Sequence, residues 1–271
     1  PVTPTSQRRT RSTVAALDWR FPERSMHKVL RQPMEDDLSM TTVVFPVSIG
    51  GRYEQTGLSR YREHLELIRA SQVLERRLLE VLRFELGSVY DVSVGLDFAS
   101  GPRPQHPEDP IHGTLAVRFT CNPDDAQRLQ AAVFDVIDDL IANGPTDEEA
   151  SKALESERLN RATARRSNEY WLEYCSGAYV SARYEGDIPT FLTQTFQLQQ
   201  QVFDNMAPEV IQETVRVILG RHRERHVLVC LLPNHKTSIA GVFNTPAVAY
   251  VGAAIAAVSV AAVVILAGRA R

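Results

Sequence analysis

The feature that most constrains the fold is a long helical segment that turns directly into a strand. Apolar residues recur at helical spacing in residues 60–84, and Gly87 follows as a stop signal. In residues 90–98 apolar and polar side chains then alternate, which is typical of a half-buried strand. The sequence therefore predicts a helix that leads straight into a strand, with the turn at Gly87.

Neighbouring segments indicate a domain that mixes strands and helices. A second alternating run, residues 115–121, is joined to the first by the proline-rich loop of residues 99–110, without a helix between them. This connection favours antiparallel pairing of the two strands. The other periodic segments predict strands at 40–47 and 227–232, and helices at 123–142, from 146 onward, and at 170–183, 187–203 and 208–219. We therefore expect an α+β fold whose antiparallel or mixed sheet carries helices packed on one face.

Local signals refine the ends of these elements. Residues 143–145 (Asn-Gly-Pro) break the helix before them, and Thr146 with Glu149 three residues later predicts a capping box at the start of the next helix. Pro46 suggests that the strand of residues 40–47 lies at an edge or ends irregularly, because proline cannot donate a hydrogen bond to a neighbouring strand.

The two ends of the chain differ in composition from the part between them. Residues 1–25 are rich in Pro, Ser, Thr and Arg, whereas residues 247–267 contain no charged side chain and, at 21 residues, match the roughly 20 that a bilayer-crossing helix needs. The expected division is a linker or disordered segment at 1–25, a domain at 26–235, a linker at 236–246, a transmembrane helix at 247–267 and a basic tail at 268–271. We therefore expect a single-pass membrane protein with a C-terminal anchor, in a compartment that the sequence leaves open.

Charge and cysteine content exclude several classes of protein. A net charge of −3 argues against nucleic acid as a partner, because such partners demand a strongly basic face. Cys121, Cys175 and Cys230 are odd in number and far apart, so they predict neither a disulfide framework nor a C-x-x-C metal pair. We expect them to be buried free thiols.

The sequence contains no motif for a metal centre or a nucleophile. His222 and His226 are four residues apart, but Glu224 stands midway between them, which fits neither His-Glu-x-x-His nor His-x-x-Glu-His. We interpret this segment as surface charge. There is no Gly-x-Ser-x-Gly elbow and no glycine-rich phosphate loop. The chain is therefore expected to hold no metal, no cofactor and no catalytic residue.

Arg83 and Tyr90 remain as candidate binding residues at the helix–strand turn. An arginine can donate two hydrogen bonds to a carboxylate or a peptide carbonyl, and a tyrosine hydroxyl can donate to a carbonyl oxygen or a developing oxyanion. The alternative is purely structural. Arginine is favourable near any helix C-terminus, and Tyr90 would share the buried face of its strand with Val92 and Val94.

Several segments in order resemble the C-terminal homologous domain of the pitrilysin/insulinase family of zinc peptidases, over residues 26–233. The first is residues 82–90 (LRFELGSVY), in which Phe84 departs from the more usual acidic residue. The others are residues 121–123 (CNP), 144–149 (GPTDEE), 168–172 (NEYWL) and 231–233 (LLP). The resemblance is to bacterial-type zinc proteases and to proteins like the mitochondrial processing peptidase.

The resemblance implies a binding role without chemistry of its own. In that family two homologous halves enclose a chamber, one with the zinc site and the other with an Arg and a Tyr that bind substrate; Arg83 and Tyr90 carry those places here. The expected function is the metal-free, substrate-binding half of a zinc metallopeptidase. Its expected partners are a zinc-bearing homologous domain, in the same precursor or on another chain, a peptide substrate and a membrane. The alternative is a non-catalytic, membrane-anchored scaffold or regulatory subunit resembling respiratory-complex core proteins.

Overall fold

The computed structural model describes residues 21–34, 36–50, 57–98, 109–180, 188–204 and 206–234. The strands are β1 (Met26–Gln32), β2 (Ser39–Ile49), β3 (Val89–Asp97), β4 (Ile111–Cys121) and β5 (Val227–Pro233). The helices are α1 (Gly57–Leu79), which continues as a π-helix (Glu80–Glu85), then α2 (Ala126–Asn143) after a 3-10 turn (Pro123–Asp125), α3 (Asp147–Ala164), α4 (Asn168–Val180), α5 (Ile188–Asp204) and α6 (Pro208–Leu219).

The strands form one mixed sheet in the order β1-β5-β2-β4-β3. β1 and β5 are parallel, and every other neighbouring pair is antiparallel, including the predicted β3–β4 pair. β5 pairs with β2 only at residues 40–44, so Pro46 lies beyond that pairing. β2 is thus an inner strand that runs regularly along β4 to Ile49, so the expected edge position or irregular end is not found; Pro46 is accommodated because the described pairing with β5 stops two residues before it.

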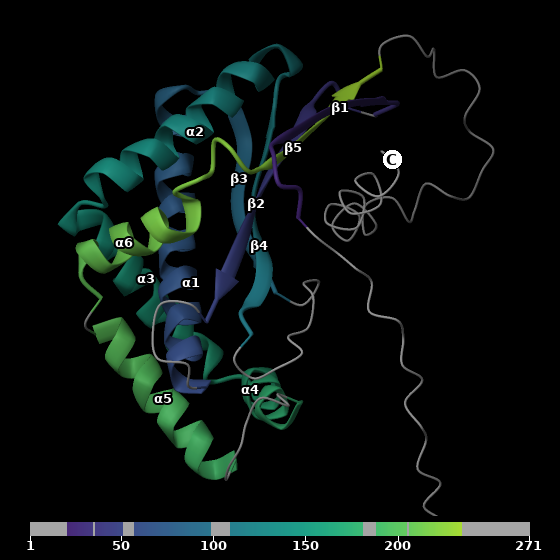
Figure 1. The fold of residues 1–271 in the computed structure, drawn as a ribbon. Helices are drawn as coiled ribbons and strands as arrows, with labels where there is room; N and C mark the ends of the chain where they lie inside the picture. The colour runs from purple at the N-terminus through teal and green to yellow at the C-terminus, as the bar shows by residue number, and fades with distance from the viewer. Residues whose placement is uncertain are drawn as a thin grey trace, which may run out of the picture.

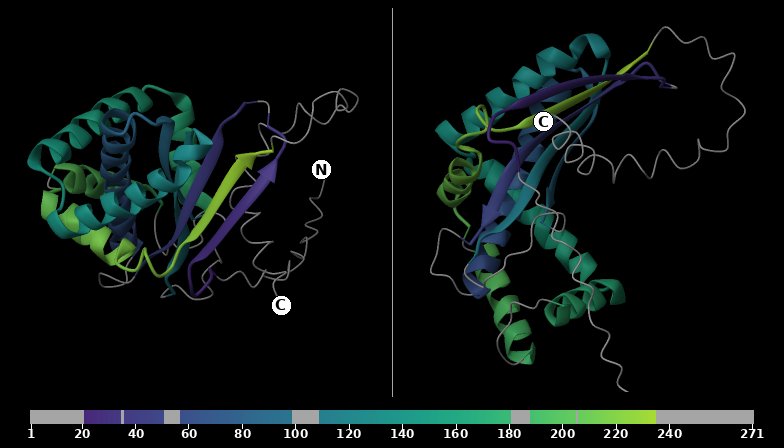
Figure 2. Two further views of the ribbon diagram at one scale, coloured as in Figure 1. Left: turned by 90° about the horizontal axis from the view of Figure 1, so that it is seen from above. Right: turned by 45° about the vertical axis from the view of Figure 1, so that its right-hand side comes forward.

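The described helices lie on one face of this sheet, as Figures 1 and 2 show. The main core forms where α1, α2 and α6 meet β2 and β4 (Figure 1). Its helical side chains are the predicted apolar stripes, which include Leu74 and Leu82 of α1 and its continuation and Leu129 and Ile137 of α2. The expected α+β fold with helices on one face is therefore confirmed.

A smaller apolar cluster lies on the other face of the sheet. Phe21, which precedes β1, is buried there against Val44, Ala116 and Val227. The Arg225 guanidinium donates a hydrogen bond to the Pro22 carbonyl oxygen and lies over the Phe21 ring. The chain just before β1 is thus fixed to the sheet by packing and by hydrogen bonding.

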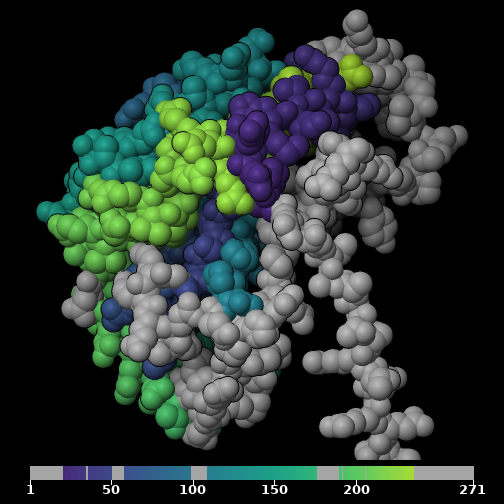
Figure 3. Space-filling view, in the orientation of Figure 1, coloured from purple at the N-terminus to yellow at the C-terminus, as the bar shows by residue number. Residues whose placement is uncertain are grey.

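The sequence did not predict β1. Its residues (MHKVLRQ) lack a clear alternation, and most are exposed because β1 is an edge strand. In the space-filling view the atoms of β1 form part of the outer surface beside those of α6 and the residues after it (Figure 3). Its place depends on pairing with β5, about two hundred residues further along the chain.

None of the helices in the described part of the chain is long and apolar enough to cross a membrane. The transmembrane helix expected at residues 247–267 lies outside the described residues.

Candidate functional site

The helix–strand turn is built by two local irregularities, and the first is a π-helix. At Glu80–Glu85 the backbone widens, so the Leu86 N–H donates to the Val81 carbonyl five residues back, at 3.0 Å. Leu82 stays fully buried, while the next three side chains are exposed. Arg83 is one of these three, and it lies in the last turn of the helix.

Gly87 ends this helix, as the sequence predicted. Its φ of 64° is in the left-handed region that favours glycine. The Ser88 N–H then donates to the Leu82 carbonyl at 3.3 Å and closes the widened helix end. The chain can therefore enter β3 two residues after the glycine.

The second irregularity is a β-bulge at Tyr90. Val89 pairs with Cys121 and Asp91 pairs with Thr120, so Tyr90 is an extra residue without a partner in the ladder. A regular strand would place Tyr90 on the same face as Val92. The bulge instead points Val89 into the core, where it is buried, and leaves 63% of Tyr90 exposed. The structural alternative, in which Tyr90 is a core residue beside Val92, is therefore wrong.

Arg83 and Tyr90 are thus brought to one turn with exposed side chains. Among the described residues, neither one has a hydrogen-bond or ion-pair partner. Phe84, between them in sequence, is 73% exposed. An exposed guanidinium and an exposed phenol can both bind an added ligand without first breaking a contact within the protein.

Polar contacts hold the backbone on either side of Tyr90. The Ser88 hydroxyl accepts a hydrogen bond from Arg128 Nη2 of α2 at 2.6 Å. The Thr120 hydroxyl of β4 donates to the Asp91 carboxylate. Tyr90 therefore projects from a segment whose side chains bind α2 two residues before it and β4 one residue after it.

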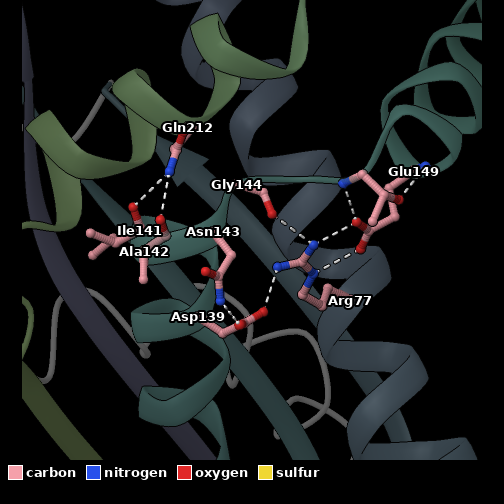
Figure 4. A network of polar contacts seen from close by, with 9 residues as sticks. Arg77, Asp139, Ile141, Ala142, Asn143, Gly144, Glu149 and Gln212 are labelled. Carbon is pink, nitrogen blue, oxygen red and sulfur yellow. Dashed lines mark hydrogen bonds and ion pairs between the residues drawn. The ribbon is translucent and has the colours of Figure 1, made fainter.

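A second polar network anchors α1 at Arg77, six residues before Arg83 (Figure 4). The guanidinium of Arg77 binds both oxygens of Glu149, with Nε to Oε1 at 2.7 Å and Nη2 to Oε2 at 2.5 Å. Its Nη1 donates to Asp139 at 2.8 Å, and Nη2 also reaches the Gly144 carbonyl at 3.1 Å. Arg77 therefore joins α1 to the α2–α3 connection.

Glu149 has a second role in the same network. Its carboxylate accepts the Thr146 N–H, and the Thr146 hydroxyl accepts the Glu149 N–H, which forms the capping box predicted from the sequence. Burial alone would raise the pKa of the Glu149 carboxyl, but hydrogen bonds from Arg77 and Thr146 outweigh it and lower the pKa. Hydrogen bonding to Glu149 in turn raises the pKa of Arg77.

The two histidines four residues apart are buried, so their interpretation as surface charge is wrong. His222 and His226 are 5% and 4% exposed and pack against the rings of Phe45 and Phe134. Burial lowers the pKa of both imidazoles. The helical periodicity of α6 ends at Leu219, and no local pattern after it indicates that the next turn folds back into the core.

These histidines do not converge on a shared metal position. His222 Nδ1 lies 2.7 Å from the Leu219 carbonyl, and His226 Nδ1 lies 2.7 Å from the His222 carbonyl. His226 Nε2 instead faces His27 Nε2 of β1 at 2.7 Å. Within the described ranges, no group of three or more His, Cys, Asp or Glu side chains could hold a metal ion.

Two of the three cysteines are buried, as the sequence predicted. Cys121 and Cys230 are buried and Cys175 is partly buried, and all three are free. Cys121 Sγ lies 3.1 Å from the Ser39 hydroxyl, and burial raises the pKa of the Cys121 thiol. Because the thiolate is the nucleophilic form, a buried thiol with a raised pKa is suited to packing rather than to catalysis.

Comparison with known families identifies the class of protein. The sequence profile of the family described as "Peptidase M16 inactive domain" matches residues 21–157. The chain therefore belongs to the M16 peptidases through their inactive domain, which confirms the resemblance to the pitrilysin/insulinase family.

Individual relatives agree with this assignment. A "Zinc protease PQQL-like" of Arabidopsis thaliana is 25% identical over 226 residues, which are 82% of this chain and 23% of that protein. The periplasmic protease PqqL from Escherichia coli has the same fold, with a TM-score of 0.55 and 16% identity over 79% of this chain and 21% of its own. A protease from Helicobacter pylori has a TM-score of 0.57 and 12% identity over 78% of this chain and 44% of its own. This chain thus spans about a quarter of the length of the Arabidopsis relative.

Proposed function

We propose that this chain is the metal-free, substrate-binding part of a zinc metallopeptidase, in which Arg83 and Tyr90 bind the peptide. One observation carries the proposal. A π-helix and a β-bulge, on either side of Gly87, expose both side chains without a partner in the described part of the chain. π-Helical turns and β-bulges are both frequent at functional sites, because they re-aim single side chains without changing the fold.

The two side chains can supply complementary hydrogen bonds to a peptide. The Arg83 guanidinium has five N–H donors and no acceptor, so it suits a peptide carbonyl or a carboxylate. The Tyr90 hydroxyl can donate to the carbonyl that is attacked, and this bond strengthens as negative charge develops on the oxygen. Both groups bind and orient; neither supplies a nucleophile.

The hydrolytic water must then be activated elsewhere. The Arabidopsis relative is named a zinc protease, and this chain matches only 23% of its length. We propose that a zinc-bearing homologous domain, in the same protein or on a partner chain, faces the turn of residues 80–91. The expected anchor at residues 247–267 belongs to the same proposal and would hold this pair of domains at a membrane.

The test is peptide turnover by the chain assembled with its zinc-bearing domain, with a fluorescence-quenched peptide as the probe. Arg83→Ala removes a charged donor and should lower kcat/KM about 100-fold, whereas Tyr90→Phe removes one hydroxyl and should lower it about tenfold. Zinc content should stay at the wild-type level in both variants, because neither residue binds the metal.

Arg76→Ala is the matched control, since Arg76 is an exposed arginine in the last turn of α1. It should cleave the peptide like the wild type. Wild-type turnover in both Arg83→Ala and Tyr90→Phe would rule out the binding role and would favour the alternative of a non-catalytic scaffold.

A further inference from the structure

We infer that Arg128 on α2 is a positioning residue, which holds the Gly87 turn in the conformation that presents Arg83 and Tyr90. The inference rests on the proposed function, because Arg128 would act by holding the residues that bind the peptide. Arg128 does not belong to the turn itself, which is formed by residues 80–91. It reaches the turn from the neighbouring helix.

A chain of hydrogen bonds connects α2 to the turn. Arg128 Nη2 donates to the Ser88 hydroxyl at 2.6 Å, and the Ser88 hydroxyl donates to the Leu86 carbonyl at 2.9 Å. The same nitrogen lies 2.9 Å from Oδ1 of Asp125, the last residue of the 3-10 turn that precedes α2. Asp125 therefore orients the guanidinium, and the guanidinium orients Ser88.

Ser88 is the residue through which both irregularities are connected. Its N–H donates to the Leu82 carbonyl and closes the π-helix that carries Arg83. Its side chain is held by Arg128 two residues before Tyr90, the extra residue of the bulge. A contact at Ser88 therefore restrains the helix end and the start of the bulge together.

The contact at Ser88 matters because Tyr90 itself has no hydrogen-bond partner among the described residues. The core fixes Leu82 and Val89, which are both buried, but Tyr90 and Arg83 are exposed and without partners among the described residues. On the far side of the bulge, Asp91 is held by Thr120. Loss of the Arg128 contact would leave the Ser88 side chain without its hydrogen bond to α2, on the helix side of the bulge.

Because Arg128 is exposed, its effect on the turn can be distinguished from an effect on the stability of the whole domain. Its side chain is 51% exposed and that of Asp125 is 34% exposed, so solvent screens the pair and its effect on global unfolding is small. The local effect is larger, because a turn opens more easily than the whole domain unfolds. Arg128→Ala should therefore change the turn and leave the unfolding midpoint near that of the wild type.

The first measurement is amide hydrogen exchange in the full chain. Arg128→Ala and Ser88→Ala should each speed exchange at the Ser88 amide about fivefold, while the core of α2 keeps its protection. The double variant should be no faster than either single variant, since both remove the same contact. Ser88→Thr keeps the hydroxyl and should retain slow exchange.

The second measurement is turnover of the same quenched peptide by the assembled enzyme. Arg128→Ala should raise KM about fivefold with kcat and zinc content little changed, because binding depends on a turn that is ordered less often. Arg216→Ala is the matched control. Arg216 is also 51% exposed and is paired with an acidic residue three positions earlier, Glu213 on α6.

The outcomes separate the two proposals. Wild-type exchange at Ser88 in Arg128→Ala, or faster exchange with an unchanged KM, would overturn the positioning role. If Arg83→Ala and Tyr90→Phe impair turnover while Arg128→Ala does not, only this inference fails. If Arg83→Ala and Tyr90→Phe both behave like the wild type, the proposed function fails, and the positioning role fails with it.

Discussion

Arg77 and Arg83 lie six residues apart on one continuous helical segment, yet they use their guanidinium groups in opposite ways. Arg77 is largely buried and binds Asp139, Glu149 and the Gly144 carbonyl. Arg83 is exposed and has no partner within the described residues. The same residue type thus builds the fold at one end of the segment and is left available at the other.

The glycines beside these two arginines differ in a parallel way. Gly144 has φ 73° and ψ −179°, a region that essentially only glycine occupies, and an added Cβ would lie 3.1 Å from Gln212 Cδ. Gly87 has φ 64°, and an added Cβ would meet nothing within 4 Å. The α2–α3 connection is therefore tightly packed, whereas the turn before β3 has open space around it.

The largest expected effect is on stability at Arg77. Arg77→Ala would leave the half-buried Glu149 carboxylate unpaired, so it should lower the free energy of unfolding by about 3 kcal/mol. Arg83→Ala should change that free energy by less than about 0.5 kcal/mol, as exposed sites usually do. Urea unfolding of the two variants measures the difference. Equal losses would contradict the division of roles between the two arginines.

The two glycine variants should differ less in their free energy of unfolding than the two arginine variants do. Gly144→Ala should cost about 3 kcal/mol, because it adds backbone strain and displaces the Gln212 side chain from the Ile141 and Ala142 carbonyls. Gly87→Ala adds strain alone and should cost about 1 kcal/mol. Thermal and urea unfolding would detect both. A greater loss at Gly87 would show that its turn is the more constrained of the two.

The smallest expected effect is a difference in acid sensitivity. The pKa of Glu149 is lowered in the folded state from 4.5, so its contribution to stability is present above pH 4.5 and is lost as the pH falls through the folded-state value. Unfolding of the wild type and of Glu149→Gln should therefore differ at neutral pH and converge in acid. If the difference in stability between the two proteins stays constant to the lowest pH, the ion pair with Arg77 is not its cause.

The sequence predicted most elements because their signals are local. The stripes of α1, α2 and α6, the alternation in β4 and the capping box at Thr146 each arise from side chains a few residues apart. β1 was missed because its position depends on pairing with β5. The buried positions of His222 and His226 were missed for a similar reason, since they depend on contacts with Phe45 and Phe134.

The sequence named the two candidate residues but did not predict the geometry that presents them. Arg83 and Tyr90 were identified from a motif, and the alternation from Tyr90 to Phe98 wrongly grouped Tyr90 with the core side chains. One extra residue in a strand reverses the two faces, and the sequence around Val89 carries no mark of it. The π-helix is hidden in the same way, because its apolar residues still follow a helical pattern closely enough.

The seven-residue spacing of Arg83 and Tyr90 now has a physical meaning. The segment between them includes one widened helical turn and one strand residue without a partner in the ladder. Each of these adds a residue relative to a regular helix and a regular strand. A chain that lost one residue from the π-helix or from the bulge could keep the arginine and the tyrosine. One of the two side chains would then point in a different direction. In this chain, the number of residues between Arg83 and Tyr90 therefore decides how the two side chains are presented as much as the residue types do.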